Sequence, residues 1–200
     1  MQLDSIVTIL DLIATFAFAI VGARIAASKG LDYGGIALIA AVASISGGTL
    51  RNLFMGQRPP WILNSWLFAS IALAVLITIL AKDRRPVGRL ILSLDTLGLA
   101  VATVSSANFA AANNANFISV IALGLVGGVT GGLLRDVLCQ VEPVLLHRET
   151  IGTSCFMGAL VYAILNHLNI SEPAIVIISG IVIVAVREIS IKKDWHLPKI

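Results

Sequence analysis

Charged residues are scarce in this 200-residue chain: Asp, Glu, Lys and Arg make up 12% of it, while hydrophobic residues make up 58% and the mean hydropathy is +0.95. A soluble domain has about a quarter charged and about half apolar residues. A soluble core of this size could not bury so much apolar surface, so lipid must cover the remainder. The composition therefore excludes an ordinary soluble domain and predicts an all-α integral membrane protein.

Chemically reactive groups are few as well. Cys139 and Cys155 have no CxxC spacing and no pair of His nearby, which argues against a disulfide or a metal site. No Walker or dinucleotide-binding motif occurs, and no Ser or Cys has a base placed beside it, so we expect no enzyme activity and no cofactor. The net charge of +3 comes from basic residues spread between apolar runs, which argues against a nucleic-acid partner.

What the chain does contain is a series of apolar stretches, each near the length of about 20 residues with which a helix crosses the hydrocarbon core. Only short polar or Pro-containing links separate them, so we expect a single transmembrane domain over residues 1–200. The seven predicted spans are Ser5–Ala27, Tyr33–Phe54, Ser65–Ala81, Val87–Ala111, Phe117–Leu138, Thr150–Asn166 and Glu172–Ile189.

The basic residues are divided unevenly between the two sides that seven spans define. Arg51 and Arg58 lie on one side, and the other 12 of the 14 Lys and Arg residues lie on the opposite side. Positive charge is enriched on the cytoplasmic side of membrane proteins, so we expect a cytoplasmic C-terminus and an outer N-terminus. The link Lys82–Pro86 is interpreted as part of this topology signal, with binding of anionic lipid headgroups as the alternative.

The sequence repeats itself without gaps, at the fixed offset that separates Asp11 from Asp95. Leu10-Asp11 aligns with Leu94-Asp95, and the densest match sets Ser46–Asn52 on Thr130–Asp136. The repeated unit contains three spans, and because three is odd, the second copy must enter the membrane from the opposite side. We therefore predict two inverted repeats, over about 5–81 and 87–166, and an additional seventh helix over about 172–189. Inverted repeats are typical of transport proteins, whose site lies where the repeats meet.

Both densest segments contain an adjacent pair of glycines. Close packing between helices accounts for part of this pattern, but adjacent glycines are also kink sites, and a kink frees carbonyl oxygens that must be satisfied by protein, water or an ion. We therefore predict that the second and fifth spans are kinked and that the carbonyls there, with two hydroxyls, form an ion path. The predicted path residues are Ser46, Gly47, Gly48, Thr130, Gly131 and Gly132.

Several charged residues lie inside the predicted spans, where they are costly and usually functional. Asp11 lies at a depth from which it can reach Arg51, and Asp95 at a depth from which it can reach Arg135 or the surroundings of Asp136. We predict two symmetry-related ion pairs that hold the kinked helices or take part in gating. The alternative is that both Arg side chains extend to the lipid headgroups.

With its two three-span units, its seventh span and its SGGTLRN and TGGLLRD segments, the chain resembles the trimeric intracellular cation channel family. The resemblance covers nearly the whole chain and implies a homotrimer in the prokaryotic inner membrane, with one potassium pore in each protomer. It implies functional roles for Gly47, Gly48 and Arg51, and for Gly131, Gly132, Arg135 and Asp136. The chain departs from the fuller pattern where Ser46 and Thr130 replace a glycine, and where Asn52 stands opposite Asp136. Prokaryotic relatives also carry a domain name that suggests glycine transport.

Three functions follow from these features. The first is a channel for monovalent cations, chiefly potassium, in which oxygens replace part of an ion's hydration shell and the acidic side chains offset its desolvation. The second is a secondary carrier for a small zwitterion such as glycine, and the third is a membrane scaffold that binds lipid. The expected partners are other copies of the chain and membrane lipids, including anionic ones, and the only expected bound ion is K⁺ or Na⁺ in transit.

Overall fold

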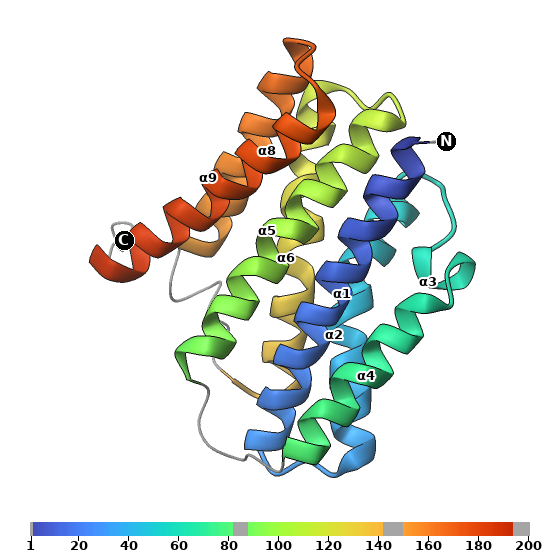
Figure 1. Ribbon diagram of the computed structural model, residues 1–200, viewed down its shortest axis with the longest axis vertical. Helices are drawn as coiled ribbons and strands as arrows, with labels where there is room; N and C mark the ends of the chain where they lie inside the picture. The colour runs from blue at the N-terminus through green and yellow to red at the C-terminus, as the bar shows by residue number, and fades with distance from the viewer. Residues whose placement is uncertain (1, 82–87, 142–149, 194–200) are drawn as a thin grey trace.

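The computed structural model describes residues 2–81, 88–141 and 150–193, and these residues fold into helices joined by short links (Figure 1). The predicted link Lys82–Pro86 lies outside the described residues, as do most of the link before Thr150 and the basic tail beyond Lys193. The helices are α1 (Gln2–Ser28), α2 (Tyr33–Phe54), α3 (Pro60–Leu63), α4 (Trp66–Ala81), α5 (Arg89–Ala112), α6 (Phe117–Leu138), α8 (Thr150–His167) and α9 (Glu172–Lys193).

Each predicted span corresponds to one long helix, with ends that differ by a few residues at most sites. Five helices are long and apolar enough to cross a membrane, namely α1, α2, α5, α6 and α9. The apolar helices Trp66–Ala81 and Ile151–His167 are shorter, since 16 residues of α4 span only about 24 Å. Helix α3 was not predicted: it is a single turn that begins at Pro60, where proline's fixed φ suits the first helical position.

Two helices begin with the same kind of cap. The Oδ1 atom of Asp32 accepts a hydrogen bond of 2.7 Å from the N–H of Gly35 at the start of α2. The Oδ1 atom of Asn116 accepts one of 2.8 Å from the N–H of Ser119 at the start of α6. A side-chain oxygen at this position satisfies one of the free N–H groups in the first turn of a helix. Asp32 and Asn116 are equivalent positions of the sequence repeat, so the two halves of the chain share this cap.

Unusual backbone conformations recur at equivalent positions of the repeat. The backbone has positive φ at Gly30 (78°) and again at its counterpart in the second unit, Asn114 (59°). It has positive φ at Gly56 (67°), after α2, and at the counterpart Gln140 (50°), after α6. Glycine adopts this conformation without steric cost, and asparagine adopts it more readily than most residues. The links before and after α2 and α6 therefore turn in the same way in both halves of the chain.

The long helices form a bundle in which α1, α2, α5 and α6 occupy the centre (Figure 1). Helix α4 packs against α1 and α2, whereas α8 packs against α5 and α6, and α9 lies against α5 and α8. In the view of Figure 1, α1 runs down from the N-terminus and α5, beside it, runs upward. The central helices thus bring the two halves of the chain into direct contact.

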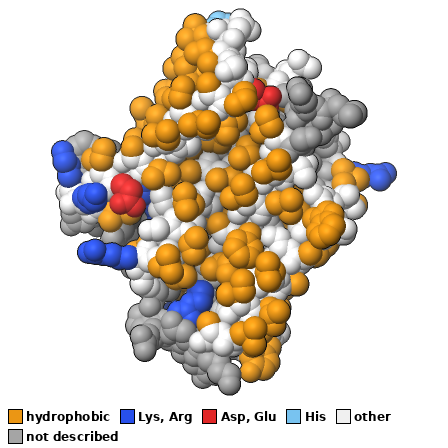
Figure 2. Space-filling model, viewed as in Figure 1, with side chains coloured by type: hydrophobic (Ala, Val, Ile, Leu, Met, Phe, Trp, Pro, Cys, Tyr) orange, Lys and Arg blue, Asp and Glu red, His pale blue; other side chains and the backbone are white. Residues whose placement is uncertain are grey.

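Large apolar side chains lie on the outside of the bundle as well as inside it. Leu38, Leu80 and Ile118 are 62%, 69% and 76% exposed. On the face shown in Figure 2, hydrophobic side chains cover the middle of the molecule and the Lys, Arg, Asp and Glu side chains lie near its margins. By contrast, α5 buries a run of polar side chains that includes Thr103, Ser105 and Asn108. An apolar exterior around a polar interior is the arrangement expected of a bundle surrounded by lipid.

Candidate functional site

The first glycine of each pair lies where α2 and α6 touch. A Cβ atom built on Gly47 would collide with the backbone carbonyl oxygen of Gly127, and one built on Gly131 would collide with that of Ala43. The two backbones are therefore in direct contact, and only residues without a side chain fit. The structure thus gives the first glycine of each pair a packing role.

The second glycine of each pair lies beside an arginine. A Cβ atom on Gly48 would lie 3.9 Å from Nη2 of Arg51, and one on Gly132 would lie 3.7 Å from Nη2 of Arg135. These glycines therefore leave room next to the two guanidinium groups. Helices α2 and α6 continue through both pairs, and the close crossing gives a physical reason for the first glycine of each pair. A bend within the continuous helices stays a prediction.

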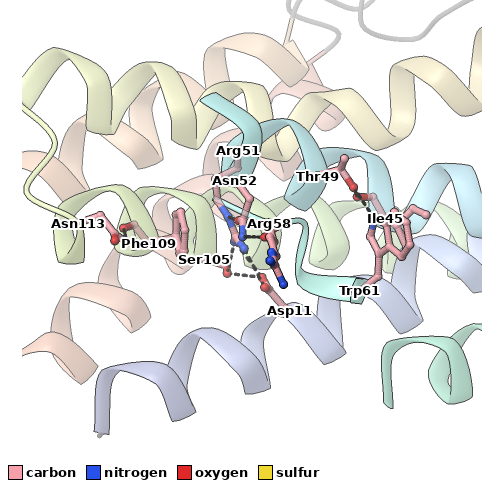
Figure 3. A network of polar contacts seen from close by, with 10 residues as sticks. All are labelled: Asp11, Ile45, Thr49, Arg51, Asn52, Arg58, Trp61, Ser105, Phe109 and Asn113. Atoms are coloured by element: carbon pink, nitrogen blue, oxygen red, sulfur yellow. Dashed lines mark hydrogen bonds and ion pairs between the residues drawn. The ribbon is translucent and has the colours of Figure 1, made fainter. Parts of the chain in front are cut away.

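The first predicted ion pair is formed as expected (Figure 3). The Nη2 atom of Arg51 lies 2.9 Å from Oδ2 of Asp11, and its Nη1 atom donates a hydrogen bond of 3.0 Å to Oδ1 of the same carboxylate. Ser105, on α5, joins both partners: its hydroxyl accepts from Nη1 of Arg51 at 3.1 Å and donates to Oδ1 of Asp11 at 2.6 Å. The pair thus connects α1, α2 and α5.

Other groups hold the guanidinium of Arg51 in place. Its Nε atom donates to Oδ1 of Asn52 at 2.9 Å, and the ring of Phe109 lies 4.4 Å from its Cζ atom (Figure 3). The amide of Asn52 in turn donates to the backbone oxygen of Arg58 at 2.7 Å and so connects the pair to the segment before α3. We call Asp11, Arg51, Asn52 and Ser105 the first cluster. Arg51 is 1% exposed, so its side chain does not extend to lipid headgroups.

The second predicted ion pair is also formed. Nη1 of Arg135 lies 2.6 Å from Oδ1 of Asp95, and Nε of Arg135 lies 2.8 Å from Oδ1 of Asp136. A second guanidinium, that of Arg187 on α9, lies with its Nη2 atom 3.5 Å from Oδ2 of Asp95. We call Asp95, Arg135, Asp136 and Arg187 the second cluster. Their side chains are at most 10% exposed in these ion pairs, so the alternative of extension to headgroups is wrong for Arg135 too.

Three members of this site were not predicted from the sequence. Ser105 and Phe109 lie on one face of α5, four residues apart, but nothing in their identity points to Arg51. Arg187 was counted as a topology charge, and the structure instead buries it to 3% exposure. Its position within an apolar stretch is the signal that could have identified it, because a charge that faces lipid there would be costly.

Two cavities flank the first ion pair. A small cavity of about 30 Å³ lies at the helix crossing, where Gly47, Gly48 and Gly131 are part of its lining. A larger cavity of about 320 Å³ is lined by both polar and apolar residues of α1, α2, α5 and the segment between α2 and α4, among them Asn52, Phe109 and Asn113. The residues that line both cavities are Asp11, Arg51, Pro60 and Leu67. The ion pair therefore forms part of the wall between the two spaces, and the smaller one has room for a water molecule.

The two hydroxyls predicted to contribute to an ion path, those of Ser46 and Thr130, lie outside the lining of the small cavity. The hydroxyls of that lining come from Thr15, Ser44 and Ser106. The hydroxyl of Thr130 donates to the carbonyl of Val126, one turn earlier in its own helix, at 2.6 Å. The hydroxyl of Ser46 is buried and has no hydrogen-bond partner among the described residues. Gly132 also lies outside this lining. Of the predicted path residues, the small cavity is therefore lined by Gly47, Gly48 and Gly131.

These features define a class of protein: a polytopic helical membrane protein whose halves meet at a glycine crossing beside buried ion pairs. The model of the family described as "Glycine transporter" matches the chain twice, over residues 8–83 and 92–167, and the starts of these two ranges are equivalent positions of the sequence repeat. Solved structures of trimeric intracellular cation (TRIC) channels share its fold. The chain belongs to this family of TRIC-like membrane proteins.

Two solved structures illustrate the likeness. The trimeric intracellular cation channel orthologue from Rhodobacter sphaeroides is 27% identical, with a TM-score of 0.87 over 94% of this chain and 98% of that chain. A second structure, from work on conductance through TRIC cation channels, is 31% identical, with a TM-score of 0.84 over 96% of each chain. Both similar proteins are channels rather than enzymes.

Bacterial relatives in sequence are membrane proteins. The inner membrane protein YadS of Escherichia coli K12 is 28% identical over 192 residues, which are 94% of this chain and 92% of that protein. A membrane protein of Deinococcus radiodurans is 30% identical over 154 residues, which are 75% of this chain and 72% of that protein. Together with the five apolar helices, these relatives make the chain a bacterial membrane protein.

Proposed function

We propose that the protein is a potassium-permeable cation channel whose path runs through each protomer, between α1, α2, α5 and α6. The observation that carries this proposal is the position of Asp11 and Arg51, which line both the large and the small cavity. The small cavity adjoins the glycine crossing and presents hydroxyls and backbone to any ion within it. Such oxygens can replace part of the hydration shell of a monovalent cation.

The ion pair itself suggests how the path is closed. The guanidinium of Arg51 stands between the two cavities, and a fixed positive charge there repels a cation. While Asp11 is bound to Arg51, its charge is offset and offers little attraction to an incoming ion. A shift of Arg51 away from the small cavity would free the carboxylate to face the cation. The described arrangement is accordingly that of a closed channel.

The assembly of the channel is part of the proposal. Two inverted repeats are supported by the doubled family match and by caps and positive-φ turns that recur at equivalent positions of the two units. The opposite directions of α1 and α5 are also in keeping with inversion (Figure 1). Helices α4 and α8 are then the third and sixth spans, and α9 is the seventh. The trimeric name of the Rhodobacter sphaeroides relative supports a homotrimer, and the Lys and Arg distribution supports an outer N-terminus.

Carriage of a small zwitterion such as glycine is the second candidate. It is favoured by the family description and by the large cavity, where Asp11 and Arg51 offer both signs of charge within one space of about 320 Å³. The ammonium group of the zwitterion would bind Asp11, and its carboxylate would bind Arg51. This mechanism requires the ion pair to open for each substrate, so the transport rate would be limited by that conformational step.

The two candidates are separated by measuring transport in liposomes that contain the purified protein. A channel conducts K⁺ down its gradient, with a flux that rises with the gradient and is independent of glycine. A carrier takes up labelled glycine with saturation and passes no unitary current. We expect K⁺ flux without saturable glycine uptake. Saturable glycine uptake without K⁺ flux would replace the channel by the carrier, and the absence of both would refute the two proposals together.

A further inference from the structure

Helix α9 places a buried guanidinium against the second ion pair. Arg187 is 3% exposed, and its Nη2 atom lies 3.5 Å from Oδ2 of Asp95. Its Nε atom donates a hydrogen bond of 3.0 Å to the hydroxyl of Thr96, the next residue of α5. The guanidinium is thereby held at two points, one on each of two adjacent residues. Glu188, the next residue of α9, lines a separate groove with Arg89 and Lys192.

The carboxylate of the first cluster has a different set of partners. There, Arg51 contacts both oxygens of Asp11, and the third partner is a neutral hydroxyl, that of Ser105. In the second cluster, Arg135 contacts Oδ1 of Asp95 at 2.6 Å, and Oδ2 faces Arg187. The third partner is therefore a full positive charge that comes from outside both repeated units. The two clusters are alike in their Asp–Arg pair and differ in the third group that contacts the carboxylate.

Packing of α9 does not account for a buried arginine. One face of α9 is already buried through Ile175, Ser179 and Ile183, and Ile183 fills the space beside Gly158 of α8. An apolar side chain at position 187 would continue that face without the desolvation penalty of a guanidinium, which amounts to several kcal/mol. A buried charge of this kind persists where it meets a specific opposite charge. In this structure that charge is Asp95.

We propose that Arg187 is a positioning residue, which holds the carboxylate of Asp95 in the orientation that Arg135 binds. Helix α9 then completes the second cluster and is not an addition that only packs on the bundle. The inference rests on the ion pairs rather than on the identity of the transported solute. It therefore stands or falls separately from the channel proposal.

The test is a double-mutant cycle on the purified full-length protein, read by its thermal unfolding midpoint in detergent. Asp95→Asn should lower the midpoint by an amount on the order of 10 °C, because it leaves the buried Arg187 without the carboxylate that it faces. Arg187→Gln should lower the midpoint by less, because Asp95 keeps its ion pair with Arg135. The double variant Asp95→Asn/Arg187→Gln should lose clearly less than the two losses added together. Asp11→Asn/Arg187→Gln is the matched control, and its losses should add, because Asp11 lies in the other cluster.

Equal coupling in both cycles, or none in either, would overturn the proposal, since a residue that only packs α9 has no preference for Asp95. If Asp95→Asn yields no folded protein, the second cycle uses Thr96→Val with Arg187→Lys. A lysine has no Nε–H to donate to Thr96, so Thr96→Val should cost little in the Arg187→Lys background and more in the wild type. Equal losses in both backgrounds would also contradict the proposal. Failure of K⁺ flux in the wild type leaves these midpoints unaffected and counts against the channel alone.

Discussion

The Nη2 atom of Arg51 lies 2.9 Å from the Oδ2 atom of Asp11, a residue 40 positions earlier on another helix. Arg135 and Asp95, which are also 40 residues apart, make the corresponding pair in the second half of the chain. The shared separation shows that the repeated sequence has been folded into a repeated contact. The pairs stand beside a crossing where two helices touch through glycine, and the first pair stands between two cavities.

Removal of the carboxylate of the first pair should destabilise the protein strongly. Asp11→Asn leaves the guanidinium of Arg51, 1% exposed, without its counter-charge, and breaking a buried pair in this way costs about 3–5 kcal/mol. Thermal unfolding in detergent measures the loss. Asp32→Asn is the control, because asparagine caps a helix as well as aspartate does. Similar small losses in both variants would show that the Asp11–Arg51 pair contributes little.

The two glycines of each pair should respond differently to alanine. Gly47→Ala and Gly131→Ala drive a methyl group into a backbone oxygen of the opposite helix, so we expect a loss of about 1–3 kcal/mol or more. A methyl group on Gly48 meets the end of Pro60 at 3.4 Å, an ordinary contact, so Gly48→Ala should be tolerated. Thermal midpoints of the variants give the comparison. Equal effects at Gly47 and Gly48 would contradict the distinction between a packing glycine and one that provides space.

The hydroxyls of the small cavity should matter more for transport than those predicted from the sequence. Ser44→Ala and Ser106→Ala each remove an oxygen from the cavity wall, so we expect a reduced K⁺ flux in liposomes. Thr130→Val keeps the shape of the side chain and removes a hydroxyl that is not part of the cavity lining, so the flux should stay close to that of the wild type. A larger loss in Thr130→Val than in both serine variants would place the path elsewhere.

The orientation of the chain can be tested by thiol labelling. Gln57 lies on the predicted outer side, Arg89 lies on the predicted cytoplasmic side, and both are exposed. With the native Cys139 and Cys155 buried, Gln57→Cys should react with a membrane-impermeant maleimide in right-side-out vesicles, and Arg89→Cys should react only after the membrane is opened. The reverse pattern would invert the proposed topology.

Much of this fold follows from the sequence because lipid imposes a simple rule: a backbone that crosses the membrane must be helical over about 20 residues. The Asp–Arg pairs could also be predicted from the sequence, since a charge inside an apolar span needs a partner and the fixed offset of the repeat shows which residues share a depth. Helix α3 could not be predicted, because one turn of four residues leaves no periodic pattern. These successes and failures follow from length and charge, which are local properties of the chain.

The contacts between distant segments were harder to foresee. The glycine pairs predicted kinks as well as close helix packing, because a lack of side chains permits both. The sequence does not show which residues lie opposite, and the structure identifies them as Gly127 and Ala43. The second role of Arg187 was missed for a related reason: an arginine near a helix end is usually interpreted as a topology signal, and the packing of α9 on α5 places Asp95 beside it. Partners of this kind depend on tertiary arrangement rather than on spacing.

Unitary K⁺ currents in planar bilayers give the sharpest test of a cation path that passes the first ion pair. The decisive comparison is between the wild type, Gly48→Leu and Gly34→Leu. A leucine at Gly48, in the lining of the small cavity, projects toward Pro60 and Arg51, which line both cavities, whereas Gly34 is exposed at the start of α2. We expect currents in the wild type and in Gly34→Leu, and their loss in a folded Gly48→Leu. Unchanged currents in Gly48→Leu would contradict the proposed path.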